Sequence, residues 1–169
     1  TENTFIFCFS DNGAFRRDRD GIDIGSNEPL RDGGVTCWEG GLRVIAMASY
    51  PKVIPIGSVV DQPIWSPDLM ITFAKLANAE LPDKKLDGKN ALNVISGQSR
   101  SKHRSFYFDF RKHAALRMGD WKIVRTKPDE QWKLFDLKND DSETKDLAAV
   151  RPEKLAELLK EFAAWRADF

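Results

Sequence analysis

An acidic residue and an amide, Asp11 and Asn12, are the side chains whose types and spacing could most readily do chemistry. They directly follow the apolar run 4–9, and the end of a buried strand in an α/β sheet is where ligands and metal ions commonly bind. Both side chains offer hard oxygen donors, which suit calcium or magnesium rather than zinc. The sequence Asp11-Asn12-Gly13 is equally typical of a tight turn. From these residues alone the turn is the favoured interpretation, because two ligands do not make a metal site.

The two histidines lie among basic residues. His103 is in the run 100–104, which we predict to be a solvated surface, and His113 has Arg117 four positions further on. A group of this kind could recognise an anion, although the end of a surface hairpin is the favoured interpretation. Neither histidine has a neighbouring serine or cysteine that would suggest an activated nucleophile.

The two cysteines cannot form a disulfide framework. Cys8 lies within the apolar run, so we expect an inert thiol in the core. Cys37 lies in a glycine-rich segment and could be exposed, but nothing in its neighbourhood argues strongly for a lowered pKa.

The composition excludes several classes of partner. The 169 residues include 26 Lys and Arg against 26 Asp and Glu, so there is no electrostatic reason to expect nucleic acid or an anionic membrane. The hydrophobic fraction of 41% is too high for a disordered chain. No apolar run approaches the roughly 18 residues of a membrane-spanning helix. The N-terminus also lacks the pattern of a signal peptide, and we expect a soluble globular chain.

The elements that must position these residues begin with the run 4–9, which predicts a strand buried on both faces. The polar, glycine-rich segment 14–39 predicts a long loop, and loops of this length are commonly functional. A second strand is predicted over 41–48. Ser66-Pro67-Asp68 predicts the start of a helix. Its buried face is expected to carry Leu69, Phe73, Leu76 and Ala77.

The second half of the chain has a different pattern. Short strands are predicted within 106–110, 114–118, 121–125 and 132–137, and their closeness in sequence favours an antiparallel sheet. Gly119-Asp120 is suited to a hairpin turn between two of them. A terminal helix is predicted from Pro152 and from an apolar stripe at helical spacing. The stripe consists of Leu155, Leu158, Leu159, Phe162 and Trp165.

We therefore expect an α/β piece over residues 1–98 and a small α+β piece over residues 99–169. The second piece has enough apolar residues to bury a small core of its own. The first piece is not expected to bury a core of its own easily, because a strand that is apolar on both faces needs neighbours on both sides.

A series of short motifs runs the whole length of the chain. In order, the pieces are Phe9-Ser10-Asp11-Asn12-Gly13, Gly25-Ser26-Asn27, Pro29-Leu30-Arg31, Trp38-Glu39-Gly40-Gly41-Leu42-Arg43-Val44, Ser66-Pro67-Asp68-Leu69, residues 113–122 from His113 to Lys122, Leu134-Phe135-Asp136-Leu137, and residues 143–148 from Glu143 to Ala148. Each piece is weak alone, but together they are specific. The series resembles the C-terminal part of the formylglycine-dependent sulfatases, which belong to the alkaline phosphatase superfamily.

This resemblance implies the edge of a large mixed sheet, followed by a small antiparallel subdomain with a packed long helix. It also implies that Asp11 and Asn12 are two ligands of a calcium ion. Relatives that use zinc or manganese usually have histidine there, whereas Asn12 supplies oxygen. The implied reaction is hydrolysis of a sulfate ester, in which a formylglycine hydrate attacks sulfur while calcium and nearby cations stabilise the sulfate charge. The implied partners are a sulfated small molecule or glycan and the N-terminal part of the fold.

The chain departs from the family pattern in three places. The Cys-x-Pro-x-Arg or Cys-x-Ala-x-Arg motif, whose cysteine becomes formylglycine, is absent from the sequence. The nucleophile, the remaining acidic ligands and the catalytic Lys and His are therefore expected before residue 1, and we predict no activity for this chain alone. Gly34 stands where the family usually has an active-site lysine. Asp141 and Ser142 stand where it tends to have Pro-Gly.

These departures leave two other functions open. One is a non-catalytic sulfatase-like module that binds a sulfated glycan or a protein, and the other is a relative of phosphodiesterases or phosphonate hydrolases. For His113 and Arg117, the resemblance suggests contact with the non-sulfate part of a substrate. Sulfatases commonly work in the periplasm, outside the cell or in lysosomes, and this sequence does not choose among these places.

Overall fold

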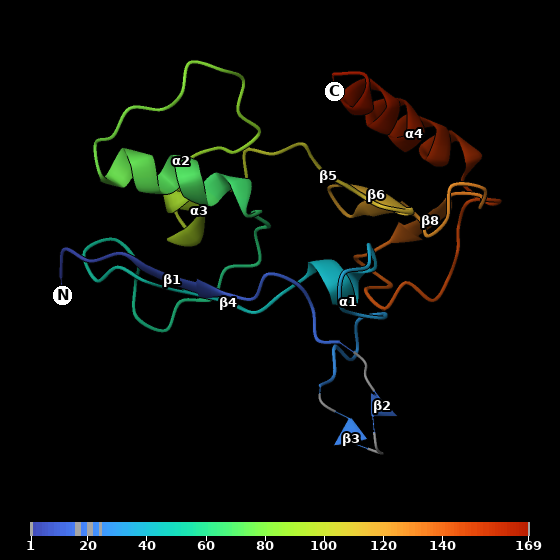
Figure 1. Ribbon diagram of the computed structural model, residues 1–169, viewed down its shortest axis with the longest axis horizontal. Coiled ribbons are helices and arrows are strands. Elements are labelled where there is room, and N and C mark those ends of the chain that lie inside the picture. The colour runs from blue at the N-terminus through green and yellow to red at the C-terminus, as the bar shows by residue number, and fades with distance from the viewer. Residues whose placement is uncertain (1, 16–17, 20–21, 24, 169) are drawn as a thin grey trace. The chain divides into compact units, whose positions relative to one another are not determined.

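The computed structural model describes residues 2–15, 18–19, 22–23 and 25–168, which form a mixed α/β structure (Figure 1). Contacts between residues divide the chain into two compact units. The first unit comprises residues 1–8 and 46–104, and the second comprises residues 9–45 and 105–169. The division into two pieces near residue 98, which the sequence predicts, stays a prediction. Within this chain, the glycine-rich segment packs with the C-terminal sheet rather than with the first strand's unit.

The first unit contains a two-stranded sheet, in which β1 (Ile6–Phe9) pairs with β4 (Ala46–Ser49). It also contains the helices α2 (Pro67–Leu76) and α3 (Leu92–Ile95). Aromatic side chains hold these parts together. The ring of Phe5 lies 5.9 Å from that of Tyr50 and 5.6 Å from that of Phe73, both edge-on.

Several expectations for this half of the chain are wrong. Strand β1 is mostly exposed rather than buried on both faces, because β4 is the only strand that pairs with it among the described residues. The strand predicted over 41–48 begins only at Ala46, and the short helix α1 (Glu39–Leu42) precedes it. In α2 the buried face differs from the predicted one. Leu69 is buried as expected, but Ile71 and Thr72 are buried as well, while Phe73 is 43% exposed.

The sheet of the second unit confirms the prediction of four short antiparallel strands. It consists of β5 (Ser105–Phe110), β6 (His113–Met118), β7 (Trp121–Arg125) and β8 (Lys133–Asp136), in that spatial order. The predicted hairpin turn joins β6 to β7. Its first residue, Gly119, has a φ of +61°, a left-handed conformation that glycine adopts without strain.

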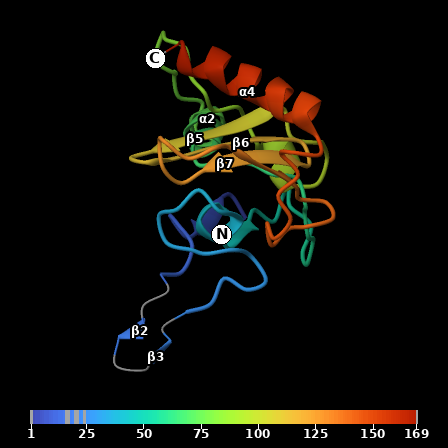
Figure 2. The ribbon, with the colours of Figure 1, turned by 90° about the vertical axis from the view of Figure 1, so that its right-hand side faces the viewer.

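Helix α4 (Pro152–Arg166) covers one face of this sheet (Figure 2). Leu158 and Phe162 from the predicted stripe are buried against the side chains that alternate onto this face, among them Leu116 and Ile123. The ring of Trp165 stacks on that of Tyr107 at 4.8 Å. No helix in the described parts of the chain is both long enough and apolar enough to cross a membrane.

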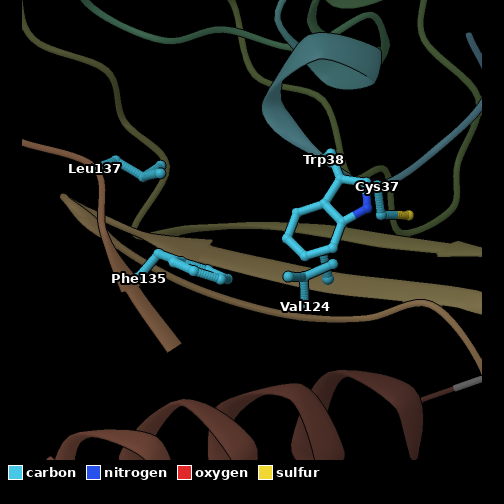
Figure 3. Packing of buried hydrophobic residues seen from close by; sticks show 6 residues of the cluster. Cys37, Trp38, Val124, Phe135 and Leu137 are labelled. Carbon is cyan, nitrogen blue, oxygen red and sulfur yellow. The ribbon is translucent and has the colours of Figure 1, made fainter. Parts of the chain in front are cut away.

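The opposite face of the sheet is covered by the end of the glycine-rich segment. Cys37 and Trp38 pack against residues of the sheet and just beyond it, as Figure 3 shows for Val124, Phe135 and Leu137. The segment 14–39 is therefore not wholly a loop. Its described residues also include the short antiparallel pair β2 (Asp18–Arg19) and β3 (Ile22–Asp23), and residues 16–17, 20–21 and 24 lie outside the described part.

Replacing Leu158 with alanine should destabilise the second unit. Leu158 is fully buried between α4 and the sheet, and Leu→Ala at such positions costs about 2–5 kcal/mol of unfolding free energy. The matched control is Lys160→Ala on the exposed side of α4, which should change the stability by less than about 0.5 kcal/mol. Urea unfolding followed by tryptophan fluorescence measures both. Equal losses in the two variants would contradict this assignment of the core.

Candidate functional site

The turn that carries Asp11 and Asn12 is bound at one end to α1 and at the other end to the segment that follows α1. The amide of Ser10 donates to the carbonyl of Ile45 at 3.2 Å, and the amide of Gly13 donates to the carbonyl of Gly41 at 3.0 Å. Within the turn, the Ser10 hydroxyl donates to the carbonyl of Asn12 at 2.7 Å. Two backbone hydrogen bonds and the Ser10 hydroxyl thus fix the turn that carries the two candidate ligands.

Glycine is required where this turn meets α1. A Cβ atom on Gly13 would lie 1.7 Å from the carbonyl oxygen of Gly40, so no other residue fits without moving the backbone. The sequence Asp11-Asn12-Gly13 was expected to suit a tight turn, and the structure adds a second reason for its glycine.

Asn27 holds the chain after the turn. Its side-chain amide donates to the carbonyls of Ala14 at 2.8 Å and Asp32 at 2.9 Å, and its side-chain oxygen accepts from the amide of Ala14 at 2.8 Å. Sequence reasoning included Asn27 in a motif without assigning it this role. The only available signal was its place in the motif series, since the partners are 13 and 5 positions away.

An open cleft of about 710 Å³ lies beside the turn. It is lined by residues of the segments 10–15, 26–28 and 43–45 and by Leu30, so Asp11, Asn12 and Arg43 share it. Asp11 is exposed, Asn12 is half-buried, and neither side chain has a hydrogen-bond partner among the described residues. In the described parts of the chain, no three His, Cys, Asp or Glu side chains form a group that could hold a metal ion. The two oxygen donors fit a hard cation, but they supply only part of the ligand shell that calcium takes.

A buried cluster of charged residues lies next to this site, between α1 and the sheet. Lys122 of β7 is fully buried, and its Nζ lies 2.9 Å from Glu39 Oε1 and 2.8 Å from Glu143 Oε1. Glu143 Oε2 also accepts a hydrogen bond from the backbone amide of Glu39 at 2.7 Å. Arg117 of β6 adds a second cation 3.5 Å from Glu39 Oε2. One buried cation, Lys122, therefore meets two buried carboxylates, and the half-buried Arg117 adds a second cation beside them.

Burial in this cluster changes the pKa of the Glu143 carboxyl. Removal from water raises the pKa of Glu143 above its usual range, and the attraction of Lys122 and the hydrogen bond from the Glu39 amide offset only part of the rise. The backbone of the same residue is also used, since its carbonyl accepts a hydrogen bond from Arg31 Nη1 at 2.7 Å. Sequence reasoning missed this cluster, although all of its members lie in the quoted motifs.

Comparisons with known proteins agree with this architecture. A family model described as "N-sulphoglucosamine sulphohydrolase, C-terminal" matches residues 36–165. The chain belongs to the sulfatase family. A sulfatase from Formosa agariphila is 33% identical over 170 residues, which cover 89% of this chain and 30% of the relative. Human steryl-sulfatase is 35% identical over 112 residues, which cover 64% of this chain and 19% of the enzyme.

Solved structures place the chain in the same part of the family. The crystal structure of Ps i-CgsB matches with a TM-score of 0.82 and 31% identity, over 97% of this chain and 36% of that one. A complex of the same protein with k-i-k-neocarrahexaose matches with a TM-score of 0.81. The chain thus corresponds to a C-terminal region of sulfatases and spans roughly a fifth to just over a third of the length of these relatives.

One departure from the sulfatase pattern now has a structural context. Gly34 has a φ of +57°, and a Cβ at this position would lie 2.8 Å from the ring of Phe15. The left-handed backbone and the aromatic ring both favour glycine here. A lysine could not replace Gly34 in this conformation without moving Phe15.

The residues predicted to contact substrate lie on the face of the sheet that packs against Trp38. Side chains alternate along β6, so His113, Ala115 and Arg117 share this face. Ala115 is buried in the same hydrophobic cluster as Trp38. Neither His113 nor Arg117 lines the cleft beside Asp11. The Arg117 guanidinium instead lies 3.5 Å from Glu39 Oε2, and its Nε donates a hydrogen bond to the carbonyl of Gly119 at 3.0 Å. A role of these two residues in substrate binding stays a prediction.

His103 is not the solvated residue that the basic run 100–104 suggested. Its side chain is 6% exposed, and Nε2 lies 2.7 Å from Oδ1 of the buried Asp68 in the first unit. The same oxygen accepts from the backbone amide of Lys89 at 2.7 Å. Sequence reasoning had treated Asp68 only as a favourable residue at the start of α2.

The two cysteines reverse their expected environments. Cys8 is exposed on β1, and Cys37 is 2% exposed in the core beneath Trp38. Burial raises the pKa of the Cys37 thiol to about 11, and the nearby Lys122 counteracts only part of this effect. Cys37 is therefore held as a thiol at neutral pH.

This difference predicts selective labelling. At pH 7.5, iodoacetamide should modify Cys8 and leave Cys37 untouched, because only the thiolate reacts and Cys37 is both buried and protonated. Mass spectrometry of the peptides should show Cys37 labelled only after unfolding in guanidinium chloride. The variant Cys8→Ser, as the control, should take up no label when folded. Rapid labelling of Cys37 in that variant would contradict the structure of this core.

Proposed function

We propose that this chain is the C-terminal part of a sulfatase that hydrolyses sulfate esters, with Asp11 and Asn12 as two calcium ligands. The observation that carries the proposal is the turn itself. Its backbone is bound on both sides, and Asp11 and Asn12 line an open cleft that Arg43 also lines. Membership of the sulfatase family supports the type of reaction.

In this proposal, Asp11 and Asn12 hold the cation through side-chain oxygens and Arg43 adds positive charge in the same cleft. Calcium, when bound, would stabilise negative charge on the sulfate oxygens. The formylglycine nucleophile lies outside this chain, since neither Cys8 nor Cys37 stands in the required motif. The remaining calcium ligands are likewise supplied by the N-terminal part of the fold.

The exposed strand β1 supports such an N-terminal part. Ile6 is 55% exposed, Phe9 43%, and Met47 of the paired strand β4 61%. A soluble protein rarely leaves large apolar side chains together on a sheet in this way. We propose that further strands and helices of a complete sulfatase cover them.

A sulfated glycan or a sulfated small molecule is the proposed substrate class. Ps i-CgsB, which is 31% identical, has been crystallised with k-i-k-neocarrahexaose, and human steryl-sulfatase is named for a different kind of sulfate ester. We assign His113 and Arg117 as candidate contacts to the non-sulfate part of the substrate, on the basis of their shared face of β6.

A non-catalytic module that binds a sulfated glycan is the second candidate function. The observation that favours it is Gly34, whose left-handed conformation and contact with Phe15 both favour glycine over the lysine that is usual in the family. The third alternative, a phosphodiesterase or phosphonate hydrolase, is less well supported because Asn12 is an oxygen donor where relatives that use zinc or manganese usually have histidine.

The calcium assignment can be tested in the complete sulfatase that the proposal requires. Asp11→Ala and Asn12→Ala should each lower kcat/KM for an aryl sulfate by more than about 100-fold, because loss of a direct ligand should exceed the 10–100-fold typical of outer-shell partners. The matched controls, Asp129→Ala and Asn139→Ala, change exposed residues of the same types away from the cleft and should be nearly neutral. Wild-type activity in both ligand variants would refute the assignment.

The position of the nucleophile has its own test. This chain alone should not hydrolyse an aryl sulfate, with or without calcium, because its sequence lacks the formylglycine motif. Clear turnover by the purified chain would contradict the proposal. Turnover by the complete protein with verified formylglycine would instead exclude the non-catalytic alternative.

A further inference from the structure

We propose that the buried charges of Lys122, Glu39 and Glu143 position the Asp11–Asn12 turn, which makes Lys122 a positioning residue for the metal site. The inference rests on the proposed role of this turn in binding calcium. It assigns a function to a cluster that touches neither the proposed ion nor the cleft.

The cluster holds Glu39 from two directions. Lys122 binds its carboxylate at 2.9 Å, while the carboxylate of Glu143 binds its backbone amide at 2.7 Å. All three side chains are nearly or completely buried, so water does not compete for these hydrogen bonds. Charge-assisted hydrogen bonds in such surroundings are short and directional, and they define one orientation of the residue that they hold.

Glu39 is the first residue of α1, and α1 is in direct contact with the turn. Gly41 accepts the hydrogen bond from Gly13, and Gly40 approaches Gly13 so closely that no Cβ fits between them. Both contacts are between backbones. A shift of α1 therefore moves Gly13 directly, and Asn12 is the residue immediately before Gly13 in the chain.

Apolar packing alone would not provide this precision. Trp38 anchors the same segment on Val124 and Phe135, but hydrophobic contact is non-directional and tolerates small sliding movements. A buried ion pair is itself weak evidence for stability, because apolar residues of similar volume commonly replace it without loss. Orientation of α1 is thus the contribution that the charges make and that Trp38 does not.

The test uses the complete sulfatase and a charge-balanced variant. Lys122→Met alone leaves two buried carboxylates without their main cation and can prevent folding. The decisive variant is therefore Lys122→Met with Glu143→Gln, which removes one charge of each sign and nearly preserves the volumes. The matched control is Leu158→Ala, a destabilising change on the α4 side of the same sheet.

Two measurements report on the position of the turn. Calcium titration by calorimetry should show an affinity about tenfold weaker in the double variant, the scale of effects from outer-shell partners. Hydrogen exchange should show a faster amide at Gly13, and kcat should recover at saturating calcium. Leu158→Ala should lower the melting temperature and leave both the calcium affinity and the Gly13 exchange unchanged.

The outcomes separate this inference from the proposed function. Wild-type calcium affinity and wild-type Gly13 exchange in the double variant would overturn the positioning role. An equal loss of calcium affinity in Leu158→Ala would also overturn it, since the cluster would then act only through overall stability. A wild-type enzyme that binds no calcium would refute the ligand assignment instead, and the Gly13 exchange would still decide whether the charges position the turn.

Discussion

The second unit depends on how the ammonium group of Lys122 is neutralised inside it. A buried charge without a partner is very costly, so β7 can take its place in the sheet only if carboxylates meet it there. The two carboxylates come from Glu39, 83 positions earlier in the chain, and from Glu143, which lies beyond β8. This requirement joins the sheet, α1 and the turn after β8 into one assembly. None of these parts can shift far without exposing or stranding a charge.

The same sheet uses different chemistry on its two faces because side chains alternate along each strand. Towards α4, aliphatic residues such as Ile123 and Leu134 meet the stripe of the helix, and this face provides hydrophobic stabilisation. On the other face the charges are combined with aromatic packing. The guanidinium of Arg31 lies 3.7 Å from the ring centre of Trp38 while it donates to the carbonyl of Glu143, so one side chain links both kinds of contact. One face is thus packed with apolar side chains against α4, whereas the other combines buried charges with apolar and aromatic packing.

Local patterns predicted the elements whose structure depends on local forces. The stripe of α4 and the four strands β5 to β8 follow from periodicity, and Gly119 follows from the needs of a hairpin. Burial was predicted poorly because it depends on distant neighbours: Cys8 lacks a covering layer in this chain, whereas Cys37 receives one from the sheet. The segment 41–48 looked like a strand, but it starts within the short helix α1, where backbone carbonyls approach Gly40 and Gly41 too closely for a Cβ atom.

The candidate site shows the same division between local and distant information. Residue types placed Asp11 and Asn12 after β1, yet nothing local could show that charges from β7 and from beyond β8 meet at Glu39 in α1. The arrangement has a chemical logic. A side chain can bind a cation well only if its oxygens are not already committed to other partners. Because backbone hydrogen bonds and a glycine contact hold the turn, the oxygens of Asp11 and Asn12 remain available at the cleft. In the proposed calcium site, the charges that would position the turn are buried in the second unit and do not line the cleft.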